Sequence, residues 1–176
     1  MNIDTRNKIL STLKELLPYL ILIIVIILIK KFLFTTILVN GKSMNDTLKE
    51  KDFMILNKLS YKLNDIDRFD IVVVDALNEK IIKRVIGLPG EHIKFEDNKL
   101  YINGKQVTDS YAKGITDDFD LNELGLEVIP DDYYFVLGDN REDSLDSRVI
   151  GVVKKDKIIG TTDFIIYPFN RFGKVK

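Results

Sequence analysis

The sequence contains no cysteine and only one histidine among its 176 residues. Without cysteine the chain has no disulfide framework, no thiol nucleophile and no thiolate metal ligand. The single histidine, His92, provides no set of imidazoles for a histidine metal cluster, so we expect neither a metal nor a cofactor. The 26 basic and 27 acidic residues nearly cancel, so no strong field draws the chain to nucleic acid.

Apolar residues are concentrated near the N-terminus. The stretch 16–29 carries no charge, and apolar character resumes at Phe32 after two lysines. As a helix, the uncharged stretch is about 21 Å long, against a hydrocarbon core of roughly 30 Å. A membrane span must therefore recruit residues on either side, with the lysines reaching the headgroups. The alternative is a buried helix of a soluble protein, which would need apolar cover on all sides.

Alanine is missing from this end of the chain. A cleavable signal peptide needs a small-x-small site shortly after its apolar core. The first alanine is Ala76, and the pair Gly41/Ser43 lies more than ten residues beyond the uncharged stretch. We therefore expect an uncleaved transmembrane anchor over residues 16–38, preceded by a short segment over residues 1–15. Basic residues on both sides leave its orientation undecided by charge.

From Asp52 onward the sequence is typical of β-strands. Short runs rich in Val, Ile, Phe and Tyr are bounded by turn residues such as Asn103-Gly104. No helical repeat separates them, which favours one mostly β domain over residues 39–176, an antiparallel sandwich or barrel. We expect strands over Phe53 to Leu56, Phe69 to Val74, Lys80 to Ile86, His92 to Phe95, Leu100 to Ile102, Tyr133 to Leu137 and Thr161 to Tyr167.

Ser43 lies shortly after the apolar run ends. A serine at the start of a strand region is usually a turn former that bonds to its own backbone. Gly41, however, lets the backbone approach a ligand closely, and Lys42 and Ser43 supply N–H groups for a developing oxyanion. Ser43 is therefore a candidate nucleophile, and a hydroxyl in that role needs a base to take its proton.

Two side chains are candidates for the base. His92 follows a Gly-Glu turn and reads as a half-exposed strand residue. Lys83 lies in the run Ile81 to Ile86, where alternate side chains point to opposite faces and Arg84 faces away from it. An unpaired amine among apolar neighbours loses up to about 3–5 pKa units from about 10.4, which leaves much of it as free base near neutrality. A solvated lysine on an edge strand is the alternative.

A charged loop, residues 138–148, follows the last of these central strands. It does not match a calcium loop, because an EF-hand register from Asp139 would put Arg141 at the third ligand position. Mutual Asp/Arg pairing that stiffens a loop beside a site is the better interpretation.

Four segments follow the apolar anchor in an order that resembles the bacterial type I signal peptidases, in their shorter Gram-positive-like form. They are Gly41 to Met44, Arg68 to Val73, Lys83 to Gly90 and Gly138 to Arg148. The resemblance implies that Ser43 is the nucleophile, Lys83 the general base and Ser144 the hydroxyl that orients the lysine amine. It also implies supporting salt bridges at Arg84, Asp139, Asp146 and Arg148. The residues that we expect to form pocket walls are Ile37, Val39, Met44, Leu48, Ile81 and Ile82. By the resemblance such a pocket would favour small substrate residues. The alternative is that these six residues simply pack in the core.

By this resemblance the chain would be a membrane-bound serine endopeptidase with a Ser/Lys dyad. It would remove N-terminal signal peptides from exported preproteins after Ala-x-Ala type sequences, with its N-terminus in the cytoplasm and its catalytic domain outside. The implied partners are preprotein signal peptides, the lipid bilayer and a nearby secretion translocon. One alternative is a non-cleaving factor that binds and presents exported subunits such as pilins. A LexA-like self-cleaving regulator would need a DNA-binding module, which residues 1–39 do not resemble.

The sequence departs from the family pattern at one position. The family usually reads Ser-Met-x-Pro-Thr, and here Asp46 stands in place of the proline. Proline would hold φ at about −65°, whereas Asp46 forms a less rigid Asx turn. A carboxylate near Lys83 would also favour the ammonium. On this basis we expect a more alkaline activity profile than that of the Asp46→Pro variant.

Overall fold

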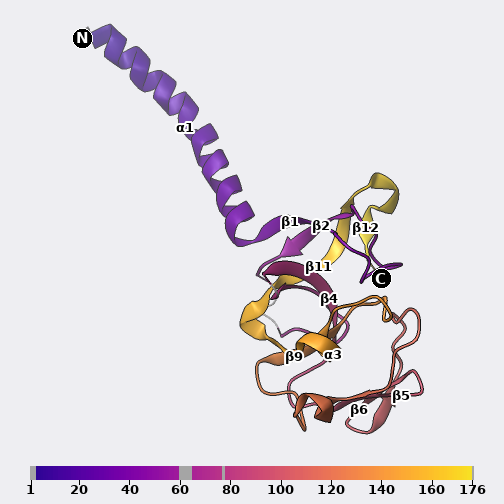
Figure 1. Cartoon of the computed structure of the whole chain (residues 1–176). Coiled ribbons are helices and arrows are strands. Elements are labelled where there is room, and N and C mark those ends of the chain that lie inside the picture. Colours follow the sequence, from indigo (N-terminus) through magenta and orange to yellow (C-terminus); the bar gives the residue numbers. More distant parts are fainter. Residues whose placement is uncertain (1–2, 60–64, 77, 176) are drawn as a thin grey trace.

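The computed structural model describes residues 3–59, 65–76 and 78–175, so residues 1 and 2 of the expected N-terminal segment lie outside the described residues. One long helix, α1 (Ile3–Phe32), projects away from a body built of two β-sheets (Figure 1). The helix joins the body at strands β1 and β2, and strands β5 and β6 lie at the far end.

Helix α1 contains the segment Thr12–Lys30, which has a mean hydropathy of 2.4 and no buried residues. These 19 residues span about 28 Å as a helix, close to the thickness of a hydrocarbon core. The helix ends at Phe32, and strand β1 (Phe34–Leu38) follows it. The expected anchor range 16–38 therefore extends beyond the helix. Residues in β1 alternate between exposed and half-buried, which is the pattern of a strand.

The larger sheet has eight strands in the order β1-β2-β11-β3-β4-β9-β10, with β12 paired to β11. All its pairs are antiparallel. The remaining bounds are β2 (Phe53–Asn57), β3 (Ile71–Ala76), β4 (Glu79–Gly87), β9 (Tyr133–Leu137), β10 (Val153–Lys154), β11 (Ile158–Tyr167) and β12 (Gly173–Lys174). Three short helices flank these strands: α3 (Ser147–Ile150), η2 (Lys155–Lys157) and η3 (Phe169–Arg171).

The smaller sheet has four strands in the order β7-β6-β5-β8, and its pairs are also antiparallel. It comprises β5 (Ile93–Glu96), β6 (Lys99–Ile102), β7 (Lys105–Val107) and β8 (Phe119–Asp120), with helix η1 (Leu121–Leu124) after β8. The turn between β5 and β6 has Asp97 at φ 51° and Asn98 at φ 60°, as a tight two-residue hairpin requires.

A mostly antiparallel β fold is confirmed, but the barrel alternative is wrong. Among the described residues the order of the larger sheet begins at β1 and ends at β10, and no pairing joins these two strands to close the sheet. Each of the seven predicted strands overlaps an observed one. The strands that went unpredicted are β1, β7, β8, β10 and β12. Strands β8, β10 and β12 are two residues long and carry no periodic signal, β7 has three residues, and β1 lies within the range expected for the anchor.

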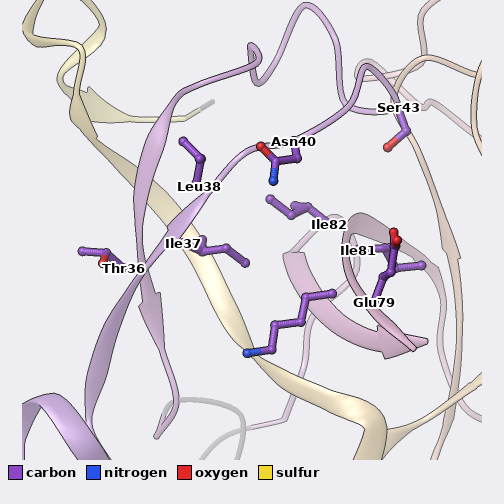
Figure 2. Close-up of a pocket in the computed structure, with 9 residues that line it drawn as sticks. Thr36, Ile37, Leu38, Asn40, Ser43, Glu79, Ile81 and Ile82 are labelled. Carbon is purple, nitrogen blue, oxygen red and sulfur yellow. The ribbon is translucent and has the colours of Figure 1, made fainter. Parts of the chain in front are cut away.

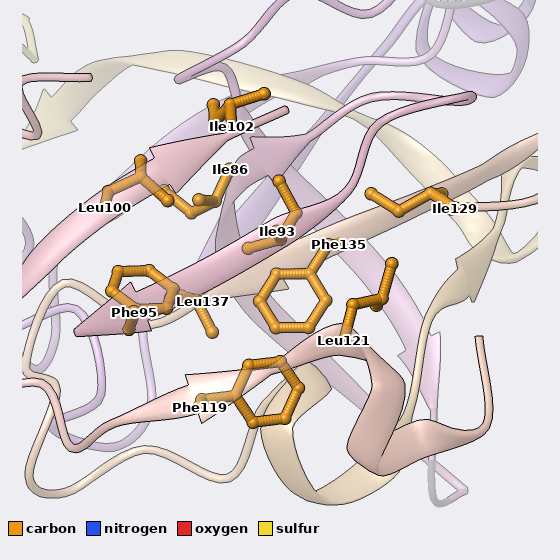
Figure 3. Packing of buried hydrophobic residues seen from close by; sticks show 10 residues of the cluster. All are labelled: Ile86, Ile93, Phe95, Leu100, Ile102, Phe119, Leu121, Ile129, Phe135 and Leu137. Atoms are coloured by element: carbon orange, nitrogen blue, oxygen red, sulfur yellow. The ribbon is translucent and has the colours of Figure 1, made fainter. Parts of the chain in front are cut away.

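Strands β4 and β9 are packed on both faces. Ile86, Phe135 and Leu137 belong to a buried cluster against the smaller sheet (Figure 3). Val85 and Val136 point the other way, into a second cluster formed with β3. Burying one large aliphatic or aromatic side chain stabilises a fold by about 1.5–3 kcal/mol, so β4 is held firmly from both sides. This strand carries the two charged residues on which the site is built.

Candidate active site

Strand β4 buries two adjacent cations. Lys83 is 2% exposed and Arg84 is 3% exposed. Because neighbouring side chains on a strand point to opposite faces, the two cations need separate sets of partners. A buried charge without a partner costs several kcal/mol, so these partners decide what each residue is able to do.

The Lys83 amine has a serine hydroxyl as its partner. Its Nζ donates a hydrogen bond of 3.1 Å to Oγ of Ser144. Burial lowers the pKa of Lys83 to about 8, and the nearby carboxylate of Asp146 opposes part of that shift. The guanidinium of Arg148 adds to the lowering. A lysine with this pKa has a substantial fraction of free amine near neutral pH.

Arg84 binds the loop 138–148 through Asp139. Its guanidinium forms two hydrogen bonds with the carboxylate of Asp139, of 2.8 and 2.6 Å. It also donates to the carbonyl of Phe69 at 2.8 Å, and its Cζ lies 3.7 Å from the centroid of the Tyr111 ring. Such paired and stacked geometry uses the planar fork of arginine, and each of its three nitrogens donates within this arrangement.

Asp146 and Arg148 form the second ion pair of the loop. Arg148 donates from Nε and Nη2 to the two carboxylate oxygens of Asp146, at 2.9 Å each. Asp146 also caps helix α3 and accepts from the backbone N–H of Gly138 at 3.1 Å. Arg148 donates to the carbonyl of Arg141 at 2.7 Å, so the loop is closed on itself around Ser144.

A third buried ion pair escaped the sequence reasoning. Arg141 is paired with Asp109, and it also donates to Gly138 O at 3.0 Å and to Thr116 Oγ1 at 3.2 Å. Asp109 and Thr116 belong to the polar region between the predicted strands, where the sequence carries no signal of long-range pairing. Two of the three ion pairs of this loop thus draw a partner, Arg84 or Asp109, from a distant part of the chain.

Ser43 is tied to the same loop through its backbone. Asn140 donates from its backbone N–H to the Ser43 carbonyl at 3.0 Å and from its side-chain amide to the Lys42 carbonyl at 3.2 Å. Gly138 lies between the two serines: a Cβ there would clash with Ser144 Oγ and would lie 2.5 Å from the Ser43 carbonyl oxygen. The structure therefore places the Ser43 backbone and the Ser144 side chain on either side of Gly138, and Ser144 in turn accepts from Lys83.

The turn that carries Ser43 is anchored from the opposite side as well. Met44 and Leu48 are 2% and 0% exposed, and both belong to the buried cluster under the turn. Arg171 forms an ion pair of 2.9 Å with the buried carboxylate of Asp52 and donates to the Thr47 carbonyl at 3.0 Å. These contacts fix the backbone on which a nucleophile must be held.

A groove of about 530 Å³ leads to Ser43 (Figure 2). In this view Thr36 lies at one end and Ser43 at the other, with Asn40 between them. Of the expected pocket walls, three line the groove, and Val39, Met44 and Leu48 are instead packed in the core. The lining residues are Thr36, Ile37, Leu38, Asn40, Ser43, Glu79, Lys80, Ile81 and Ile82.

His92 lies outside this arrangement. Its Nδ1 is 2.7 Å from the Glu127 carbonyl, and its Nε2 is 3.3 Å from the carboxylate of Asp120. These partners belong to the smaller sheet and the polar segment beside it. The histidine is half-buried, as the sequence suggested, but it directly precedes β5 and is not part of the strand; it does not line the groove.

Asp46 is exposed and adopts a left-handed conformation, with φ 68°. The carboxylates that act on the pKa of Lys83 are those of Asp146, Asp143 and Asp139, and Asp46 is not among them. The expectation of a more alkaline profile than that of the Asp46→Pro variant therefore has no electrostatic support. The proline variant would instead disturb the turn, because proline holds φ at about −65°.

The Asp46→Pro variant is expected to lower the free energy of unfolding by about 1–3 kcal/mol, since the ring cannot adopt the positive φ found here. Denaturant unfolding of the full chain in detergent measures this. The Asp46→Asn variant is the matched control, because asparagine tolerates the left-handed region and removes only the charge. Equal stability of the proline variant and the wild type would contradict the prediction.

Known proteins resemble this chain over nearly its whole length. The family model described as signal peptidase, peptidase S26, matches residues 12–167. A signal peptidase I from Bacillus caldolyticus is 42% identical, over 89% of this chain and 92% of that protein. Signal peptidase I S from Bacillus subtilis is 36% identical, over 98% of this chain and 97% of that protein.

The structure also has a solved relative. A crystal structure of a signal peptidase I from Enterococcus faecalis matches with a TM-score of 0.52 and 36% sequence identity, covering 56% of this chain and 97% of that one. Fold and site together define a β-rich peptidase. The chain belongs to the signal peptidase I family, peptidase S26.

Proposed function

We propose that this protein is a membrane-anchored serine endopeptidase that removes signal peptides from exported preproteins after Ala-x-Ala type sequences, with Ser43 as nucleophile and Lys83 as general base. One observation carries this most directly. A buried lysine with a pKa of about 8 donates to Ser144, on a loop whose Asn140 also binds the Ser43 backbone. Helix α1 supplies the anchor, and the catalytic domain faces the outer side, where signal peptides emerge.

The proposed reaction proceeds in two steps. The free amine of Lys83 takes the proton of the Ser43 hydroxyl as Oγ attacks the scissile carbonyl. The resulting ammonium gives a proton to the departing amine of the mature protein, which leaves an acyl-enzyme on Ser43. Water, activated in turn by Lys83, then releases the signal peptide as a carboxylate. Gly41 has no side-chain hydroxyl, so backbone N–H groups stabilise the oxyanion.

The substrate binds as an added strand between β1 and β4. Among the described residues, strand β1 pairs with β2 alone and β9 pairs with β4 from Arg84 onward, so the segment 79–83 has one edge available. Strand addition uses such edges for main-chain hydrogen bonds, while alternate side chains enter pockets. Ile37 and Ile82 line the same groove as Ser43, and in this proposal their branched side chains limit the space to small residues such as alanine.

Cleavage of an Ala-x-Ala preprotein by the full chain in detergent tests the proposal. The wild type is expected to release the signal peptide, and Ser43→Ala is expected to leave the preprotein intact. An intact preprotein with wild-type enzyme, together with its retention on the protein, would favour a non-cleaving binding factor. Cleavage that survives Ser43→Ala would exclude this serine as the nucleophile.

The pH dependence of cleavage is expected to follow the Lys83 amine. Below a pKa of about 8 the free-base fraction falls tenfold for each pH unit, so kcat/KM rises with pH and levels off above 8. The matched variant is Asp143→Asn: the Asp143 carboxylate raises the pKa of Lys83, and its loss moves the midpoint to lower pH. A flat profile between pH 6 and 8 would count against Lys83 as the base.

The Gly138→Ala variant is expected to lose about 100-fold in kcat. Its methyl group would collide with Ser144 Oγ and the Ser43 carbonyl, which separates the reacting groups by a fraction of an ångström or more. The matched control is Gly87→Ala, where the atoms nearest to a Cβ belong to the side chains of Ile93 and Ile129. Steady-state cleavage rates, corrected for the folded fraction, should separate the two variants; similar losses would contradict the prediction.

A further inference from the structure

The peptide unit that joins Lys42 to Ser43 is held by its carbonyl oxygen. The side-chain amide of Asn140 donates to this oxygen at 3.2 Å, and the backbone N–H of Asn45 donates to it at 2.9 Å. A carbonyl oxygen has two lone pairs, and here each has a donor. The peptide unit that precedes the proposed nucleophile therefore has one fixed orientation.

The N–H of the same peptide unit belongs to Ser43 and points the other way. A trans peptide unit directs its C=O and its N–H to opposite sides. Ser43 lines the groove, whereas Asn140 and Asn45 do not, so the Lys42 carbonyl is turned away from the groove and the Ser43 N–H toward it. Within the described residues this N–H has no hydrogen-bond acceptor. It is a free donor beside the hydroxyl that is proposed to attack.

We propose that the side chain of Asn140 is a positioning residue for the oxyanion: by holding the Lys42 carbonyl, it aims the Ser43 N–H at the oxygen of the scissile carbonyl. This inference rests on the proposed function, and it names the backbone donor and the side chain that orients it. A donor stabilises developing charge best when it is already in place and no reorganisation is needed during the reaction.

One loop then serves both halves of the reaction. Ser144 binds the amine of the proposed base, and Asn140, four residues earlier, orients the oxyanion donor. Asn140 is itself held on both sides. The N–H of Lys113 donates to the Asp139 carbonyl at 2.8 Å, and the N–H of Arg141 donates to the Lys113 carbonyl at 3.0 Å. The amide therefore acts from a fixed backbone.

The Asn140→Asp variant is expected to lower kcat about 100-fold and to leave KM nearly unchanged, as for the loss of an oxyanion-hole donor. A carboxylate has the shape of the amide, but it has no N–H to donate and repels the Lys42 carbonyl. Asn140→Ala is expected to lose about tenfold, because Asn45 still holds that carbonyl. Both variants keep the backbone N–H that binds Ser43.

Steady-state cleavage of an Ala-x-Ala preprotein by the full chain in detergent measures these losses. Rates are compared on the alkaline plateau of each pH profile, so that a change in the pKa of Lys83 does not contribute. The matched control is Asn170→Asp, because Asn170 is exposed in η3 and does not line the groove. This control is expected to cleave at the wild-type rate.

A peptide aldehyde that ends in Ala-x-Ala separates oxyanion binding from substrate binding. The Ser43 Oγ forms a bond to the aldehyde carbon, the hydroxyl proton passes to Lys83, and the aldehyde oxygen becomes an alkoxide at the proposed donor. The inhibition constant of the aldehyde is expected to rise in each Asn140 variant by the same factor as kcat/KM falls. The corresponding peptide alcohol has no carbonyl to attack and is expected to bind wild type and variants equally.

Three outcomes overturn the inference. They are a wild-type kcat in Asn140→Asp, equal losses of affinity for the aldehyde and the alcohol, which would indicate a disturbed groove, and losses of activity that are explained by a smaller folded fraction. Failure of the wild type to cleave the preprotein would instead overturn the proposed function, and the inference with it, so the two failures are distinguishable.

Discussion

The Lys83→Met variant is expected to lose roughly 10⁴-fold or more in the rate of preprotein cleavage, a loss typical of removing a member of a nucleophile–base unit. Methionine has about the length of the lysine stem and suits a site that is 2% exposed, but it has no group to accept the Ser43 proton. Single-turnover cleavage by the full chain in detergent, monitored as release of the signal peptide, measures the loss.

The stability of this variant separates lost chemistry from lost folding. Burial disfavours the charged amine, so an apolar side chain of similar shape is expected to leave the unfolding temperature unchanged or slightly higher. Lys154→Met, an exposed position on β10 far along the sheet order, controls for the loss of a positive charge. More than about one per cent residual activity in a folded Lys83→Met enzyme would exclude this amine as an essential base.

Much of the fold follows from local patterns. Runs of β-branched and aromatic residues between turn residues predict strands, because each run must pair and bury one or both faces. The end of the helix was not evident from the sequence. Residues 34–38 continue the apolar run although two of them are threonines, and their pairing with β2 identifies them as a strand. Hydropathy alone does not separate a helix from a strand that directly follows it, so the range 16–38 expected for the anchor includes both.

The ion pairs of the site could be predicted where both partners lie in one motif, but not where the partners lie far apart in the sequence. Asp146 and Arg148 lie two residues apart and pair with each other, as charge alternation suggests. Asp109 reaches Arg141 only through the fold, because the two lie 32 positions apart in the chain, with strands β8 and β9 between them. The pocket walls were also hard to predict: Val39, expected to line the groove, is packed in a buried cluster instead. The sequence shows that a residue is apolar, but it does not show whether the side chain points into the core or into the groove.

The Asp139→Ala variant is expected to lower the free energy of unfolding by about 3–5 kcal/mol, the usual cost of leaving one partner of a buried ion pair alone. Asp139 is fully buried and Arg84 is 3% exposed, so neither gains water when the other is lost. Arg84 would retain only the Phe69 carbonyl and the Tyr111 ring. Denaturant unfolding of the full chain in detergent measures the change.

Two further variants establish that burial is the cause. Asp163→Ala removes the exposed ion pair with Lys174, whose side chains are 63% and 74% accessible, and should cost less than about 1 kcal/mol. Arg84→Met/Asp139→Ala removes both buried charges and should be more stable than Asp139→Ala, since no unpaired guanidinium is left behind. If the double variant loses as much free energy of unfolding as Asp139→Ala and Arg84→Met together, the two residues contribute through packing and not through their charges. In that case the packing of neighbouring residues, and not this ion pair, would hold the loop 138–148 in place.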